Sequence, residues 1–311
     1  MEQKYIRELV LNELKEKAVA EQCDAEYLVK IFNHHMFNHE ILGVPYFEHV
    51  IKVYKLIAPA AKQTEDYLKL VPYIATIFDM VISLLIVIDD ILDQSEMRSG
   101  KLCWHKIVGV EAAANDSHIM MGCVFYLLKK HFSHLDCYTN LLELVHESLF
   151  TISLGQHFDD KMSREDFDNF TEKNYKIMIR NKTSYSLYFS LGALMYLAGY
   201  SNPETHKKAK EFFFELGYMF QVQNDFWDCY EHMNLSSKSN TDIVEGKLTW
   251  LAVQCLKIAT VNQKELFFQH YGKKMEESEV KIKELYDQLN MQKLSKRSDG
   301  LTSGQNQQHR E

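Results

Sequence analysis

An apolar run that ends in three carboxylates constrains this chain more than any other stretch. Met80–Ile88 is apolar apart from Ser83 and is long enough for a helix, so we expect it to be buried. Asp89, Asp90 and Asp93 follow directly, and on a helix the first and third lie one turn apart on one face. Carboxylates packed this closely repel each other unless a cation lies between them. Oxygen ligands without Cys or His favour Mg²⁺.

A second stretch, Phe220–Asp228, repeats this pattern far along the chain. It is amphipathic and carries oxygen-bearing side chains at Asn224, Asp225 and Asp228, the spacing i, i+1 and i+4. Two such clusters that face each other across a cavity can hold a polyphosphate through shared metal ions. A single acidic triplet would be explained equally well by a helix end that faces solvent, so the prediction of a site depends on the pair.

Composition predicts an all-α protein. The 311 residues include only 4 prolines and 12 glycines, and helical periodicity is long while alternating strand patterns are absent. No Pro-, Gly- or Ser-rich linker divides the chain, so we expect one domain over residues 1–292 and a polar, disordered tail over 293–311. Asn115–Ser117 is expected to cap a helix. The expected helices cover residues 4–20, 25–38, 46–58, 65–93, 117–132, 138–160, 165–198, 203–232, 244–258 and 262–289.

Charge and cysteine content exclude several other classes of protein. The net charge of −8 gives no support for nucleic-acid binding. The six cysteines lack the spacing of a disulfide framework, which fits a reducing compartment. No charge-free apolar run reaches about 18 residues, so no membrane span is expected. Met1–Tyr5 does not resemble a signal or transit peptide, which favours the cytoplasm, with a trimmed organellar precursor as the alternative.

Four motifs in a fixed order resemble those of the trans-isoprenyl diphosphate synthases, especially the farnesyl diphosphate synthases. Asp89–Trp104 resembles the first aspartate-rich motif of that family, and the stretch from Phe220 to Lys247 resembles the second. Gly155–Asp159 and Lys182–Tyr185 match two further segments between them. The resemblance covers roughly residues 25–290. It implies the class I isoprenoid (terpenoid) synthase fold, an all-α bundle around a central cavity, and a homodimer.

The resemblance also implies how the site works. Metal ions and basic side chains neutralise the diphosphate that leaves an allylic substrate. The implied metal ligands are Asp89, Asp93, Asn224 and Asp228, with Asp90 and Asp225 completing the catalytic set. The implied diphosphate-binding residues are Arg98, Lys182, Gln221, Lys238 and Lys247, with Asp159 as a helper. The implied cofactor is Mg²⁺, three ions in all, with Mn²⁺ as a substitute.

The cavity needs apolar walls that exclude water and aromatic faces that stabilise carbocations. The candidates for these roles are Leu84, Leu85, Tyr185, Tyr188, Phe189, Phe226 and Trp227. An aromatic side chain at helical spacing is also a common core residue, so a packing role is the alternative for each of them. Leu84 and Leu85 replace bulkier aromatic residues of the farnesyl synthases, which favours a deeper pocket and a C15 substrate.

The chain departs from the family where the second substrate, isopentenyl diphosphate, would bind. Leu42 and Pro45 lie where the family has Lys and Arg, Ser99 replaces the second of two arginines, and Ile82 replaces a glutamine. A buried diphosphate needs cations, so this loss removes the second-substrate site and spares the first. Asn224 replaces an aspartate, as in many cyclising terpene synthases.

These departures lead us to expect a terpene synthase. It would ionise farnesyl diphosphate without a second substrate and release a sesquiterpene, hydrocarbon or alcohol, plus diphosphate. Two alternatives stay open. One is a short-chain trans-prenyltransferase, a farnesyl or geranyl diphosphate synthase. The other is a non-catalytic partner or splice form, because family members continue past residue 293 with further helices.

Overall fold

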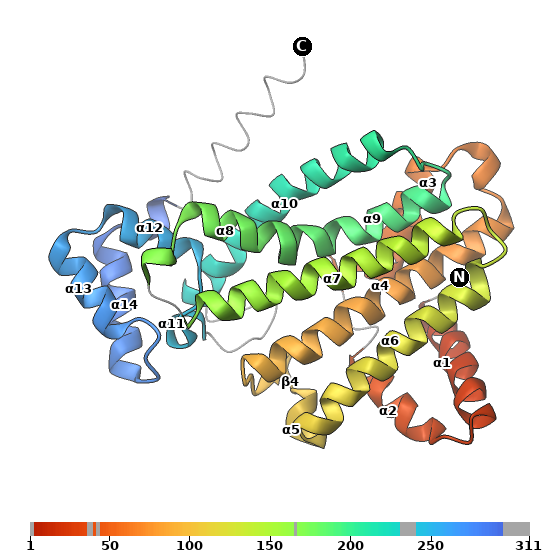
Figure 1. The fold of residues 1–311 in the computed structure, drawn as a ribbon, viewed down its shortest axis with the longest axis horizontal. Coiled ribbons are helices and arrows are strands. Elements are labelled where there is room, and N and C mark those ends of the chain that lie inside the picture. The colour runs from red at the N-terminus through yellow and green to blue at the C-terminus, as the bar shows by residue number, and fades with distance from the viewer. Residues whose placement is uncertain (1–2, 36–39, 42–43, 165–166, 231–240, 295–311) are drawn as a thin grey trace, which may run out of the picture. The chain divides into compact units, whose positions relative to one another are not determined.

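A computed structural model describes residues 3–35, 40–41, 44–164, 167–230 and 241–294, and within these residues the fold is all-α (Figure 1). The strands among them form two short antiparallel hairpins, β1(Glu40–Ile41) with β2(Val44–Pro45) and β3(Met97–Arg98) with β4(Lys101–Leu102). The all-α prediction is confirmed. The predicted disordered tail lies, from residue 295 onward, outside the described residues.

Contacts divide the chain into two compact units, and we describe each by itself. Unit 1 consists of residues 1–91, 103–150 and 186–210, and unit 2 of residues 92–102, 151–185 and 211–311. The prediction of a single domain over residues 1–292 stays a prediction.

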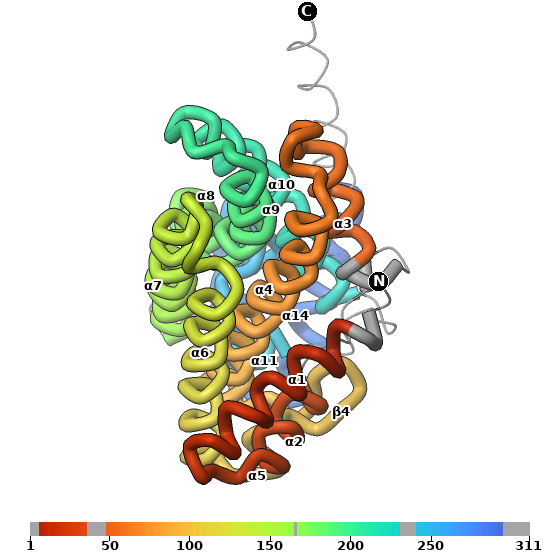
Figure 2. Tube along the Cα trace, turned by 90° about the vertical axis from the view of Figure 1, so that its right-hand side faces the viewer, coloured from red at the N-terminus to blue at the C-terminus, as the bar shows by residue number. Residues whose placement is uncertain are grey.

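Unit 1 is built on helices from the first two thirds of the chain. Within it, α1 packs beside α2 (Figure 2). Helix α1 buries Ile6, Val10 and Leu14, which share one helical face. The helices that lie wholly or partly in unit 1 are α1(Gln3–Ala20), α2(Ala25–His35), α3(Tyr46–Ile57), the 3₁₀ turn η1(Ala60–Lys62), α4(Glu65–Leu92), α5(Trp104–Val108), α6(Val110–Phe132), α7(Tyr138–Met162), α9(Tyr185–Leu197) and the start of α10(Pro203–Tyr230).

Helix α4 contains the long apolar run, which is buried as predicted. Met80, Val81 and Val87 are no more than 1% exposed, and the helix ends at Leu92, one residue before Asp93. By length and composition α4 alone among the described helices could cross a membrane, but 72% of its most apolar window is buried. Such burial is typical of a core helix, so α4 is only weak support for a membrane span.

Unit 2 gathers the end of α7, most of α10 and the C-terminal helices around an aromatic core. Fully buried members of this core include Tyr175, Phe267, Tyr271 and Tyr286. Figure 1 shows α13 and α14 side by side. The remaining elements of unit 2 are the 3₁₀ turn η2(Phe167–Asn169), α8(Glu172–Ile179), the π-helical segment η3(Arg180–Ser184), α11(Asp242–Glu245), α12(Trp250–Ile258), α13(Val261–His270) and α14(Glu276–Gln288).

The predicted capping of a helix at Asn115–Ser117 is wrong. Helix α6 begins seven residues earlier, at Val110. Asp116 cannot cap it, because its carboxylate is 1% exposed and accepts hydrogen bonds from the Tyr27 hydroxyl at 2.8 Å and the Trp104 indole N–H at 2.7 Å. The polar side chain that resembled a cap in the sequence therefore satisfies tertiary partners inside unit 1.

Three predicted long helices are interrupted in the structure. The expected helix at 165–198 is divided into η2, α8, η3 and α9; that at 244–258 into α11 and α12; and that at 262–289 into α13 and α14. Threonines begin new helices at two of these breaks: Thr171 accepts from the Asn174 N–H, and Thr249 from the Ala252 N–H. The apolar periodicity hides these interruptions because the separate helices bury similar faces.

Candidate functional site

Unit 2 holds an alternating set of two carboxylates and two ammonium groups, which we call the charge cluster: Asp93, Asp159, Lys182 and Lys247. The Lys247 ammonium lies 2.5 Å from Asp93 Oδ1 and 3.8 Å from Asp159 Oδ2. Lys182 donates to the same Asp159 oxygen at 2.7 Å. The side chains of Asp93, Asp159 and Lys247 are at most 9% exposed. Residues from four separate segments of the chain therefore meet in one buried network.

Burial and charge act in opposite directions on Lys247. Burial alone would lower the pKa of its ammonium, but Asp159 and Asp93 outweigh this and raise the pKa above its usual value. Lys247 is therefore charged at neutral pH. Ammonium groups that are paired with carboxylates can exchange these partners for the oxygens of a phosphate. The charge cluster can thus receive an anion once its carboxylates find another positive partner.

Asp225 is the centre of a second buried network in unit 2. Its Oδ2 accepts from the Tyr175 hydroxyl and from the Trp250 N–H, both at 2.7 Å, and its Oδ1 accepts from the Gln221 amide at 2.8 Å. The Gln221 oxygen in turn accepts from the Thr183 hydroxyl at 2.7 Å. Both oxygens of Asp225 are therefore used by protein donors. This carboxylate holds the polar face of α10 in position and links it to the segment that carries Lys182.

The raised pKa of Asp225 predicts how the free energy of unfolding depends on pH. Burial and then the charge of Asp242 raise this pKa to about 7, against the three hydrogen bonds that favour the ionised form. The folded state therefore binds the proton more tightly than the unfolded chain, whose carboxyl has a pKa near 3.8. The resulting stability is fully present below about pH 4 and is lost as the pH rises to about 7. We expect Asp225→Asn to remove this slope, at most about 1.4 kcal/mol per pH unit.

Urea unfolding of both proteins between pH 5 and pH 8, in EDTA, measures this difference. Asp136→Asn, which changes an exposed carboxyl, is the matched control and should keep the wild-type slope. Equal slopes for wild type and Asp225→Asn would contradict the expectation.

The π-helical segment η3, which carries Lys182 and Thr183, is clamped between two glycines. A Cβ at Gly155 of α7 would lie 2.7 Å from the Lys182 backbone nitrogen, and a Cβ at Gly217 of α10 would lie 2.9 Å from the Cα of Ser184. Only glycine allows both helices to approach this closely. One-turn π segments are frequent at functional sites, and here the wider turn directs the Lys182 and Thr183 side chains to the two networks.

We expect Gly217→Ala to lower the free energy of unfolding by about 1–3 kcal/mol, because the backbone of η3 must move to admit a methyl group. Gly122→Ala is the matched control: Gly122 is exposed on α6 with no atom within 4 Å of its would-be Cβ. This control should stabilise the protein by up to about 1 kcal/mol through helix propensity. Thermal or urea unfolding measures both, and a shift in the same direction for the two variants would refute the clamp.

Similarity to known proteins assigns the chain to a family. Residues 49–289 match the polyprenyl synthetase family. The chain is 35% identical to the farnesyl pyrophosphate synthase of Gallus gallus over 247 residues, which are 78% of this chain and 67% of that protein. It is 33% identical to the enzyme of Homo sapiens over 247 residues, 78% of this chain and 59% of that protein. The chain belongs to the polyprenyl synthetase family. The predicted resemblance is confirmed.

A solved structure agrees with this at the level of the fold. The farnesyl diphosphate synthase of T. brucei, determined in complex with risedronate, aligns with a TM-score of 0.88 at 23% identity, covering 97% of this chain and 90% of that one. The isoprenoid-synthase fold predicted from the motifs is thus confirmed. The matched stretch spans only 59–67% of the chicken and human relatives.

The structure brings part of the predicted site together. Asp93, Lys182 and Lys247 meet in the charge cluster, and Gln221 and Asp225 meet in the second network. Helix α10 carries both Asn224, which is half-buried, and Asp228, which is 8% exposed. The Asp228 carboxylate accepts a hydrogen bond from the backbone N–H of Asp242 at 3.2 Å.

Other predicted residues belong to unit 1, to the β3–β4 hairpin, or to the part of the chain outside the described residues. Asp89, half-buried, and Asp90, 3% exposed, belong to unit 1. Arg98, half-buried, pairs with Lys101 in the β3–β4 hairpin of unit 2. Lys238 lies outside the described residues, as does Leu42 of the second-substrate motif.

The predicted cavity residues are largely packed against protein. Tyr188 is 1% exposed, and its hydroxyl lies 2.6 Å from His206 Nδ1. His206 Nε2 lies 2.7 Å from the Tyr200 carbonyl, so Nε2 is protonated and Tyr188 is the donor to Nδ1. Leu84 is 6% exposed. The Phe189 ring packs against Phe78, and the Phe226 ring packs against Tyr230. The remaining candidates are half-buried: Leu85, Tyr185 and Trp227. Tyr188 therefore has the packing role that was the alternative to a place on the cavity wall.

The sequence did not reveal the residues that hold the predicted site in place. Tyr175 and the Trp250 backbone N–H anchor Asp225, and neither belongs to a motif. Tyr175 lies seven residues before Lys182, two helical turns away on a similar face. This spacing is the one signal in the sequence by which Tyr175 could be identified.

The donor set fits a divalent ion of the kind used in this family. Asp93, Asn224 and Asp228 offer only oxygen atoms, and Mg²⁺ is bound by few protein oxygens together with water and phosphate. No group of three or more carboxylate, His or Cys side chains is assembled for a metal within the described residues. In the charge cluster, ammonium groups take the place of a cation beside Asp93 and Asp159.

Proposed function

We propose that this chain is a metal-dependent short-chain prenyltransferase, which joins an allylic diphosphate to isopentenyl diphosphate. The charge cluster carries the proposal, because it pairs lysines and aspartates of the predicted diphosphate and metal motifs within 2.5–3.8 Å. The curated relatives are named farnesyl pyrophosphate synthases, which favours transfer over the release of a sesquiterpene that we expected from the sequence. The prenyltransferase was the first of the two alternatives.

In this proposal the basic residues stabilise the leaving diphosphate. The allylic C–O bond breaks and its electron pair leaves with the diphosphate, on which Lys182 and Lys247 place two positive charges. The double bond of isopentenyl diphosphate attacks the allylic cation, and a proton is then lost to give a longer allylic diphosphate. Bound Mg²⁺ would add positive charge at the leaving oxygens, and Asp93, Asn224 and Asp228 of unit 2 would supply oxygen ligands to it.

A terpene synthase is the second candidate, and residues at the predicted second-substrate site favour it. Ser99, exposed in the turn between β3 and β4, and Ile82, half-buried on α4, offer no charge to a second diphosphate. Without that substrate the cation would be captured by the chain's own double bonds and would then lose a proton or react with water. The product would be a volatile C15 compound plus diphosphate.

One assay separates these functions. The purified protein is incubated with Mg²⁺ and either geranyl or farnesyl diphosphate, with and without isopentenyl diphosphate, and both volatile products and longer diphosphates are measured. Longer diphosphates that require isopentenyl diphosphate would support the prenyltransferase. A volatile C15 product formed without it, and lost in Asp89→Ala, would overturn the transferase and favour the terpene synthase. Neither product in any tube would favour the non-catalytic partner.

Three finer predictions belong to the same proposal. We propose three Mg²⁺ ions with Mn²⁺ as a substitute, a homodimer, and a cytoplasmic location. Metal titration by calorimetry in the presence of diphosphate counts the ions, and repeating the assay with Mn²⁺ tests substitution. Light scattering of the purified chain gives its mass in solution, and a monomeric mass would refute the dimer. Imaging of the tagged full-length chain in its own cells tests the location.

A further inference from the structure

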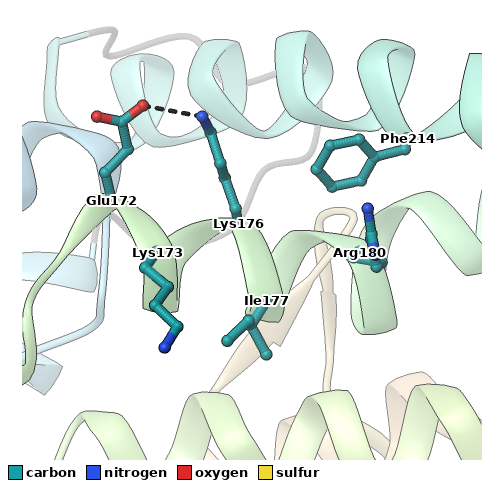
Figure 3. A pocket seen from close by; sticks show the side chains of 6 residues that line it. All are labelled: Glu172, Lys173, Lys176, Ile177, Arg180 and Phe214. Atoms are coloured by element: carbon teal, nitrogen blue, oxygen red, sulfur yellow. Dashed lines mark ion pairs between the residues drawn. The ribbon is translucent and has the colours of Figure 1, made fainter.

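An open pocket of about 520 Å³ in unit 2 is lined by residues of α8, η3 and α10. Five of its lining residues come from one side of α8 and η3, and the sixth, Phe214, comes from α10 (Figure 3). The lining consists of Glu172, Lys173, Lys176, Ile177, Arg180 and Phe214. We call this the α8 pocket. It shares no residue with the charge cluster or with the Asp225 network.

The cations of the α8 pocket outnumber its anions. Lys173, Lys176 and Arg180 follow each other at intervals of three and four residues, so they lie on one face. The acid in the lining, Glu172, lies 3.0 Å from Lys176 (Figure 3). It also lies 3.7 Å from the neighbouring Lys257. Glu215 adds a further negative charge near Lys176. Four basic side chains against two acidic ones leave the pocket with net positive charge.

Two of these cations are available to a ligand. Lys173 has no ion-pair partner within the described residues. The Arg180 guanidinium lies 4.6 Å from the centre of the Phe214 ring. Stacking on an aromatic face orients a guanidinium and leaves its N–H donors at the edge free to bind an oxyanion. Lys173 and Arg180 lie two helical turns apart on this face, and their long side chains can turn toward one phosphate bound between them.

The floor of the pocket is apolar. Ile177 and the Phe214 ring lie between the basic groups, and the methylene stems of the lysines extend the apolar surface (Figure 3). A volume of about 520 Å³ is within the range of small-molecule sites. Inorganic phosphate would leave this apolar surface in water. The lining therefore suits a ligand that has both a phosphate and a hydrocarbon part.

We propose that the α8 pocket is a second binding site, for a soluble amphiphilic phosphate. Its phosphate binds Lys173 and Arg180, with Lys176 beside them, and its hydrocarbon part lies against Ile177 and Phe214. The isoprenoid phosphates have this chemistry, so the choice of ligand rests on the proposed function. Arg180 is the first residue of η3, the segment that also carries Lys182. A bound ligand therefore acts on the backbone that positions the Lys182 side chain in the charge cluster.

Binding without turnover tests the proposal independently of the reaction. Farnesyl monophosphate is titrated into the full chain in EDTA by calorimetry, and inorganic phosphate serves as the second probe. We expect one saturable site for farnesyl monophosphate, at least about tenfold tighter than inorganic phosphate, because the hydrocarbon part is buried. The double variant Lys173→Ala/Arg180→Ala should weaken it by about tenfold or more.

Matched variants make the result decisive. Lys207→Ala/Lys208→Ala removes two exposed lysines of α10 in unit 1 and should leave the affinity unchanged. Phe214→Ser should weaken the binding of farnesyl monophosphate more than that of inorganic phosphate, because it removes apolar surface as well as the ring that orients Arg180. Thermal unfolding checks that each variant is folded.

Three results would overturn the proposal: equal affinity for the two probes, unchanged affinity in the Lys173/Arg180 variant, or binding to phosphatidate vesicles without binding of the soluble phosphate. The last would make the surface a membrane contact. Intact binding in a protein without prenyltransferase activity would count against the proposed function alone.

Discussion

Replacing Lys247 by methionine is expected to lower the free energy of unfolding by about 3–5 kcal/mol. The Lys247 ammonium is the partner of Asp93, at 2.5 Å, and the two side chains are 9% and 3% exposed. Methionine fills a similar volume but leaves the Asp93 carboxylate buried beside an apolar group, and an uncompensated buried charge costs far more than the pair contributed. Urea unfolding at neutral pH measures the loss.

Two controls separate this effect from a general loss of charge. Lys257→Met removes an ammonium whose side chain is 63% exposed, 3.7 Å from Glu172, and should change stability by no more than about 1 kcal/mol. The double variant Asp93→Leu/Lys247→Met removes both charges and should recover most of the lost stability. A double variant less stable than Lys247→Met would show that the pair itself, and not the unpaired carboxylate, supplies the stability.

Replacing Lys182 by methionine is expected to have its largest effect on activity. Under the proposed function, we expect kcat/KM for the allylic diphosphate to fall by about 10²–10³, because one charge that stabilises the leaving group is lost. The stability should change much less than in Lys247→Met. The Lys182 side chain is 27% exposed, and its partner Asp159 keeps Lys247 at 3.8 Å.

Steady-state kinetics with varied allylic substrate and saturating Mg²⁺ measure this effect. Lys182→Arg keeps the charge and should retain more activity than Lys182→Met. Lys281→Met, which removes a lysine paired with Glu277 on α14, is the control and should match wild type. Full activity in Lys182→Met would remove this lysine from the site.

Much of the site could be predicted because its chemistry is local in the sequence. The run from Met80 to Asp93 combines burial with carboxylates at helical spacing, and the same argument applies to Phe220–Asp228. Lys182 and Lys247 belong to motifs of the family that the comparisons confirm. The choice between prenyl transfer and terpene release is harder to predict. It depends on the absence of basic side chains at three positions, where this chain has Leu42, Pro45 and Ser99.

Some helix ends were missed although the sequence contained their signals. Thr171 and Thr249 are good N-cap residues, and each lies inside a stretch that we expected to be one helix, 165–198 and 244–258. We expected continuous helices because apolar periodicity carries across these breaks. Asp116 shows the reverse case: a side chain with the chemistry of a cap is used by Tyr27 and Trp104, which are distant in sequence.

The sequence by itself determined the helical fold, the buried α4 and the identity of the charged groups, because each of these depends on residue type and on spacing within one helix. Only the tertiary structure decided which lysine meets which carboxylate: Asp93 and Lys247 are separated by 154 residues. It also decided that Asp225 is used by Tyr175 and Trp250, and that η3 widens into a π turn between Gly155 and Gly217. Such contacts depend on how separate helices pack, and no local pattern in the sequence specifies that packing.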